Sequence, residues 1–107
     1  MLDFAFTIGG QNVAGAARPL PVIDPSTGQP FTHSPAATVA QLDQAVDAAA
    51  QAFAAWQHSS HAERSAALER VAVAIEANAA ELAELVVREQ GKPLALAQME
   101  VGGAVAW

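Results

Sequence analysis

The chain has 107 residues, no cysteine, and a net charge of −6 from 11 acidic and 5 basic side chains. This length allows one domain at most. The basic residues are scattered, which argues against the concentrated positive surface that a nucleic acid or an anionic membrane would need. Without cysteine, the chain contains no disulfide, no thiolate metal ligand and no thiol nucleophile.

Hydrophobic residues make up 52% of the chain, and many of them are alanines. Alanine favours helix but adds little burial per residue, so we expect a shallow core and large apolar side chains supplied by further polypeptide. Residues 1–4 lack the basic and apolar regions of a secretory signal, and no apolar run approaches the roughly 18 residues that span a bilayer. The cytoplasm is therefore the expected compartment.

Short strands are predicted at the start of the chain. Apolar and small or polar residues alternate over 4–8, Gly9-Gly10 suits a two-residue hairpin loop, and 11–13 would return antiparallel. After a loop over 14–18, a third strand is expected at 20–23, where prolines confine it to a sheet edge.

A turn is predicted at Asp24-Pro25-Ser26-Thr27-Gly28, because aspartate, proline and glycine occupy the positions that they favour in a type I turn. A further extended segment follows over 29–37, interrupted by Pro35. Residues 1–37 are thus expected to form strands and loops.

Residues 38–107 are expected to form about four helices. Thr38 with Gln41, and Ser60 with Glu63, have the spacing of capping boxes, and a third helix start is suggested at Asn78. Apolar residues in the first helix form a single stripe: Val39, Leu42, Val46, Ala49, Phe53 and Trp56. Those in the second are Leu68, Val71, Ala72 and Ile75, and in the third Leu82, Leu85 and Val86 are expected to be buried.

A helix stop followed at once by a helix start is predicted at 89–93. Gly91 suits the left-handed conformation at a helix C-terminus, and Pro93 suits the first turn of the next helix. Beyond it, an apolar pattern continues to Trp107, and Gly102-Gly103 within it costs about 1 kcal/mol per glycine relative to alanine. Because the sequence stops inside this pattern without a cap, we expect the native chain to continue.

No residue in this sequence is assigned a catalytic, cofactor-binding or metal-binding role. His58 and His61 straddle a helix break and His33 lies in a loop region, so exposed or capping roles are expected for all three. The glutamates fall mainly on polar helix faces or in first turns, where solvation accounts for them. Phosphate-loop, dinucleotide-binding and zinc spacings are all missing from the sequence.

The order of these segments is more specific than any one of them. A hairpin around Gly9-Gly10 leads to Asp24-Pro25-Ser26-Thr27-Gly28, then to an alanine-rich helix ending at Trp56, and finally to Glu89-Gln90-Gly91-Lys92-Pro93 with Glu100 behind it. This succession resembles the N-terminal portion of the NAD(P)-dependent aldehyde dehydrogenase superfamily over essentially the whole chain. The family commonly has asparagine where this chain has Asp24.

The resemblance implies an α/β enzyme with a Rossmann-like core and a catalytic domain, both missing here, so the chain itself is expected to be α+β and to form one incomplete domain. In such enzymes a cysteine thiolate attacks an aldehyde, hydride passes to NAD or NADP, and water releases the carboxylic acid. The family's catalytic and cofactor-binding residues lie downstream of this region. The chain alone is therefore expected to be inactive and to bind no cofactor, and the complete enzyme to be a homo-oligomer.

The resemblance also leaves several points open. Members of the family often hold a structural monovalent cation near positions that match the backbone of Ile23 and Asp24 and the side chain of Glu100. Which aldehyde is oxidised, whether NAD or NADP is used, and whether the parent is a semialdehyde or CoA-acylating member all depend on downstream residues. A different class of function, a non-enzymatic helical module that binds a partner through its apolar stripes, is the alternative.

Overall fold

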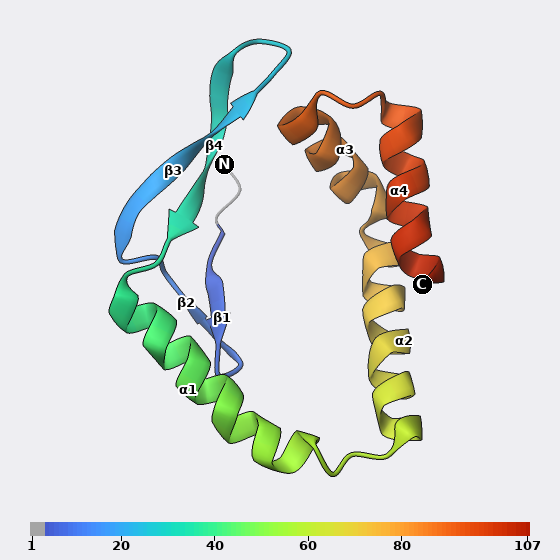
Figure 1. Ribbon diagram of the computed structural model, residues 1–107. Coiled ribbons are helices and arrows are strands. Elements are labelled where there is room, and N and C mark those ends of the chain that lie inside the picture. Colours follow the sequence, from blue (N-terminus) through green and yellow to red (C-terminus); the bar gives the residue numbers. More distant parts are fainter. Residues whose placement is uncertain (1–3) are drawn as a thin grey trace. The chain divides into compact units, whose positions relative to one another are not determined.

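The computed structural model describes residues 4–107, and it consists of four strands followed by four helices (Figure 1). The strands are β1 (Phe6–Ile8), β2 (Gln11–Val13), β3 (Ala17–Asp24) and β4 (Gln29–Ala36). The helices are α1 (Val39–Trp56), α2 (His61–Ala77), α3 (Ala79–Gln90) and α4 (Leu94–Ala106). This order confirms the α+β prediction. The expected lack of a secretory signal concerns residues 1–3, which lie outside the described residues, as well as Phe4.

The β1–β2 hairpin forms as predicted. Its antiparallel register pairs Phe6 with Val13 and Ile8 with Gln11, which leaves a two-residue loop. Gly9 and Gly10 in that loop have φ values of 57° and 78°. Positive φ at both central residues matches the right-handed twist of the two strands, so this loop needs the glycines that the sequence provides.

The second ribbon, β3–β4, is longer than predicted. β3 begins at Ala17, inside the expected loop over 14–18, and β4 continues through Pro35. Prolines fit both strands because each strand of a two-stranded ribbon has an outer edge where an N–H group forms no ladder bond. The predicted interruption at Pro35 was therefore wrong, whereas the expected edge position of the third strand fits a two-stranded ribbon.

Residue contacts divide the described chain into two compact units. One consists of the residues up to 22 together with 30–59, and the other of 23–29 together with 60–107. The first unit therefore contains α1 as well as most of the strands, and the second contains the β3–β4 turn with α2, α3 and α4. The expected division of the chain at 37/38 follows secondary structure, and whether the whole forms one incomplete domain stays a prediction.

In the first unit, α1 lies beside β1 (Figure 1). The helix uses its small residues for this contact: Ala45 and Ala48 are half-buried, and a Cβ placed on Gly9 would lie 3.8 Å from that of Ala48. The large apolar side chains of the predicted stripe are exposed instead, for example Val39 at 76% and Phe53 at 58%.

In the second unit, three apolar residues at the α3–α4 contact are buried: Ala83, Ala97 and Val101. Leu82, Leu85 and Val86 are only half-buried, so their expected burial was wrong in degree. The periodicity of apolar residues identifies the apolar side of a helix. Which residues on that side are fully buried depends on how the partner helix packs against it. The expected shallow core is what the described residues show.

The helix ends follow the local signals in most details. Both capping boxes form, at Thr38 with Gln41 and at Ser60 with Glu63. α3 begins after Asn78 as suggested, but the Asn78 side chain donates to the carbonyl oxygen of Ala74 in α2 at 2.8 Å and makes no cap bond to α3. Within residues 4–107, no helix is both long enough and apolar enough to cross a membrane.

Candidate functional site

The corner between α3 and α4 is the segment that the sequence marks most strongly. Gly91 ends α3 in the left-handed conformation, with φ of 68°, and its N–H donates to the carbonyl oxygen of Val87 at 2.8 Å. Pro93, with ψ of 138°, is the residue before α4 rather than part of its first turn as predicted. Proline suits this position because its missing N–H would have had no helical partner.

The lysine at this corner precedes α4 and forms an ion pair with a glutamate inside that helix. The ammonium of Lys92 contacts the carboxylate of Glu100, and both side chains remain partly exposed. The pair therefore ties the corner to α4, and no chemistry is assigned to it.

The turn between β3 and β4 belongs to the same compact unit as this corner. Asp24 accepts hydrogen bonds at Oδ1 from the backbone N–H of Ser26 at 2.8 Å and from its hydroxyl at 2.6 Å. These bonds, with a smaller contribution from the Arg88 guanidinium, lower the pKa of the Asp24 carboxyl. The Asp24 carbonyl oxygen accepts from the N–H groups of Thr27 and Gly28, as the predicted type I turn requires.

The turn also meets the corner closely. A Cβ placed on Gly91 would lie 2.9 Å from Cγ of Pro25. Two features therefore require glycine at position 91, namely its positive φ and the proximity of the Pro25 ring. Two segments that are 66 positions apart by residue number (91 − 25) thus meet at a glycine.

The expected cation site remains a prediction. Of the groups implied there, the backbone oxygen of Asp24 accepts from the N–H groups of Thr27 and Gly28, and the Glu100 carboxylate contacts Lys92. Among residues 4–107, no group of three or more histidine, aspartate or glutamate side chains is placed to hold a metal ion. His33, His58 and His61 are each exposed and lie in β4, in the α1–α2 turn and at the start of α2.

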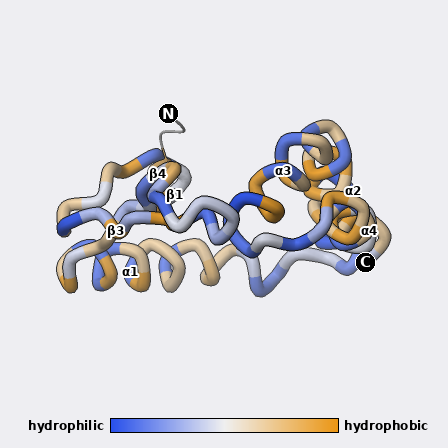
Figure 2. Tube along the Cα trace, turned by 90° about the horizontal axis from the view of Figure 1, so that it is seen from above, coloured by the Kyte–Doolittle hydropathy of each residue, from blue (hydrophilic) through white to orange (hydrophobic). Residues whose placement is uncertain are grey.

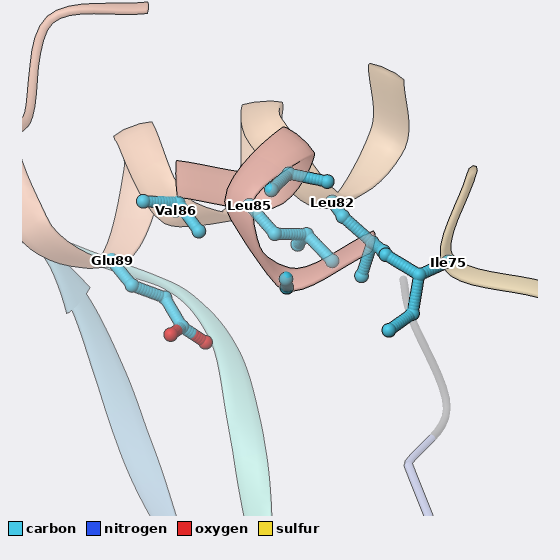
Figure 3. A pocket seen from close by; sticks show the side chains of 7 residues that line it. Ile75, Leu82, Leu85, Val86 and Glu89 are labelled. Carbon is cyan, nitrogen blue, oxygen red and sulfur yellow. The ribbon is translucent and has the colours of Figure 1, made fainter. Parts of the chain in front are cut away.

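A pocket of about 420 Å³ lies among α2, α3 and α4 (Figure 3). Its lining is apolar apart from one carboxylate, and consists of Ile75, Leu82, Leu85, Val86, Glu89, Val101 and Ala104. Such a lining offers no hydrogen-bond donor to orient a substrate and no nucleophile to react with one. Its chemistry suits the packing of apolar side chains.

Gln41 connects α1 to the segment after β2 in the first unit, a long-range contact that was not predicted from the sequence. Gln41, which is buried, receives a hydrogen bond from the N–H of Ala16 at 3.0 Å and donates its side-chain amide to the carbonyl oxygen of Ala14 at 2.8 Å. It also accepts from the N–H of Thr38 in the capping box. The signal in the sequence was the glutamine at the third helical position, but its partners more than 20 residues away carry no local pattern.

Comparison with known proteins identifies the family. The sequence model of the "Aldehyde dehydrogenase family" matches residues 13–107, which is most of the chain. The chain belongs to this family. A "Probable aldehyde dehydrogenase" of a Pseudomonas species is 43% identical over 104 residues, which is 97% of this chain and 21% of that protein.

Two further aldehyde dehydrogenase relatives agree. The "3,6-anhydro-alpha-L-galactose dehydrogenase" of Streptomyces coelicolor is 42% identical over 96% of this chain and 21% of its own length. The crystal structure of an "NAD-dependent benzaldehyde dehydrogenase" from Corynebacterium glutamicum superposes with a TM-score of 0.85 at 34% identity, covering 94% of this chain and 22% of that one. The chain thus spans about a fifth of the length of these proteins and has the fold of the N-terminal portion of an aldehyde dehydrogenase.

Proposed function

We propose that this chain forms the N-terminal scaffold of an NAD(P)-dependent aldehyde dehydrogenase. The parent reaction is the oxidation of an aldehyde to a carboxylic acid through a thiohemiacetal on a cysteine located downstream. The observation that carries this proposal is that 97% of this chain matches only 21% of a longer relative. The chain itself contains no cysteine. The role of the chain is then to position helices.

The contacts described above fit such a role. Two capping boxes fix where α1 and α2 begin, and Gln41 ties α1 to the segment after β2. Gly91 and the Lys92–Glu100 pair fix the turn from α3 into α4. These contacts set the ends and the positions of the helices.

The proposal extends to the complete enzyme. We expect it to use NAD or NADP, to form a homo-oligomer and to work in the cytoplasm, while the 107-residue chain alone binds no cofactor. The use of a nicotinamide cofactor is supported by the benzaldehyde dehydrogenase relative, which is described as NAD-dependent. A semialdehyde or a CoA-acylating parent remains an alternative within the enzyme class, since the residues that would separate these reactions lie downstream.

Two measurements test the proposal. Mass spectrometry of the protein made by its own cell should give a mass several times 11.0 kDa. The purified 107-residue chain should reduce neither NAD nor NADP with any of a panel of aliphatic, aromatic and semialdehyde substrates. Reduction of either cofactor by this chain alone would contradict the proposal.

The second candidate, a stand-alone helical interaction module, is favoured by one observation, the exposed apolar side chains of α1. An intact mass of 11.0 kDa from the source cell, together with a cooperatively melting monomer, would support this module over the dehydrogenase. A larger mass, with molten behaviour and strong dye binding by the isolated chain, would support the dehydrogenase.

A further inference from the structure

Helix α1 presents three different faces around its circumference. One face, with Gln41, Ala45 and Ala48, is buried or half-buried on the β1–β2 side. A second is polar and exposed, and carries Asp43, Gln44, Asp47 and Gln51. The third is the exposed apolar stripe, defined here as Val39, Leu42, Val46, Phe53 and Trp56. Along α1, hydrophobic and hydrophilic residues alternate as this division requires (Figure 2).

The stripe is long and consists of large side chains. From Val39 to Trp56 it runs the full length of the 18-residue helix, and each of its five members is at least half exposed. The stripe contains no charged residue. Single exposed apolar residues are ordinary, but a continuous apolar row beside a separate polar face marks a surface that another element covers.

The two apolar faces of α1 differ in the size of their side chains. The face toward β1 uses alanines, which bury little, whereas the stripe has valines, a leucine, a phenylalanine and a tryptophan. Large apolar side chains gain far more from burial than alanine does. Most of the burial that α1 has to offer is therefore unused within its own compact unit.

We infer that the stripe on α1 packs against the remaining four-fifths of the parent aldehyde dehydrogenase polypeptide. This rests on the proposed function. The chain superposes on a solved aldehyde dehydrogenase with a TM-score of 0.85 while making up 22% of it, so the same conformation exists within a much longer chain. A partner in the same polypeptide is present at a high and fixed effective concentration, so it meets this surface before a second copy does.

The test is a chimera in which residues 1–107 replace the matching portion of the Pseudomonas relative, which is 43% identical over 104 residues. Val46→Asp and Phe53→Asp place a carboxylate in the stripe. Gln44→Asp and Gln51→Asp place the same group on the polar face of the same helix and serve as matched controls. All four positions are exposed in the described structure, and none has been assigned a role in catalysis.

The stripe variants should lower the melting temperature of the chimera by at least about 5 °C more than the controls, because they bury a charge in an interface. In the isolated 107-residue chain all four variants should retain the same helical circular dichroism, and Phe53→Asp should reduce binding of a hydrophobic dye. Equal effects of stripe and control variants in the chimera would overturn the inference.

Failure of this inference is separable from failure of the proposed function. An active chimera in which stripe and control variants melt alike overturns the interface and leaves the dehydrogenase function intact. A folded chimera that shows the stripe effect but oxidises no aldehyde supports the interface and contradicts the function. If the isolated chain dimerises at micromolar concentration and Val46→Asp abolishes the dimer, a second copy is the occupant and the inference is wrong. A chimera that does not accumulate in soluble form also counts against it.

Discussion

The side-chain amide nitrogen of Gln41 lies 2.8 Å from the carbonyl oxygen of Ala14, so the residue that completes the α1 capping box also anchors the segment after β2. Gln41→Ala should destabilise the chain by about 1–3 kcal/mol, because three part-buried hydrogen bonds to backbone groups are lost. Gln44→Ala, an exposed change on the same helix, is the control. Chemical denaturation followed by circular dichroism measures both.

A second variant at this position distinguishes the acceptor role of the Gln41 amide from its donor role. Gln41→Glu keeps an acceptor for the N–H groups of Ala16 and Thr38 but, as a carboxylate, has no hydrogen to give to Ala14. It should be less stable than the native chain at neutral pH and recover part of the difference in acid, when the carboxyl is protonated. If Gln41→Glu is as stable as the native chain at every pH, the bond to Ala14 contributes nothing.

Gly91 and Gly28 offer a matched pair of substitutions. Both have φ of 68°, but a Cβ on Gly91 would lie 2.9 Å from Pro25, whereas one on Gly28 would meet nothing within 4 Å. Gly28→Ala should cost about 1–2 kcal/mol for the left-handed backbone, and Gly91→Ala should cost more because of the added contact. Denaturant midpoints measure the difference.

The contact with Pro25 can be isolated by a double substitution. Pro25→Ala removes the Cγ atom and keeps Cβ, which would lie at an ordinary 3.5 Å from the new methyl group. The pair Gly91→Ala and Pro25→Ala should therefore recover part of the loss seen in Gly91→Ala alone. Strict additivity of the two changes would show that the turn and the corner are not coupled.

The capping box at the start of α2 predicts a response to acid. Hydrogen bonds from the N–H and hydroxyl of Ser60 lower the pKa of Glu63. Because the folded pKa is below the unfolded one, the carboxylate's stabilisation is fully present above the ordinary value and is lost as the pH falls through the lowered pKa. NMR titration of the Glu63 carboxyl carbon should show this low pKa. Ser60→Ala should return it towards the ordinary value, and an unchanged titration would contradict the prediction.

Alanine substitution of the two glycines inside α4 is expected to change stability in opposite directions in the isolated chain and in the complete enzyme. A Cβ on Gly102 or Gly103 would meet nothing within 4 Å, so alanine at either position should stabilise α4 in the isolated chain by about 1 kcal/mol. Glycines inside a helix are tolerated where another backbone packs closely. If such an approach exists in the complete enzyme, the same substitution should destabilise the chimera, and thermal melts of both proteins test this.

The features predicted correctly from the sequence depend on residues close together in the chain. The Thr38 and Ser60 caps, the Gly9-Gly10 loop and the left-handed Gly91 each need only neighbours within about four positions. The features that were missed depend on distant partners. The bonds from Gln41 to the segment after β2, and the burial of Ala83 rather than Leu82, follow from how elements pack. Family membership was predicted because the order of the motifs combines many weak local signals.

The composition of the small α3–α4 core sets which substitutions this region tolerates. Ala83 and Ala97 are fully buried, and the only larger member of that core is Val101. Such a core has almost no methyl groups to delete, so the usual large-to-small changes leave few cavities in it. Its weakness is overpacking, because an added methylene has no space to enter between two helices in close contact. In a mutational scan of the isolated chain, the conservative replacement of alanine by valine or leucine at 83 and 97 would therefore be more damaging than loss of the exposed Trp56.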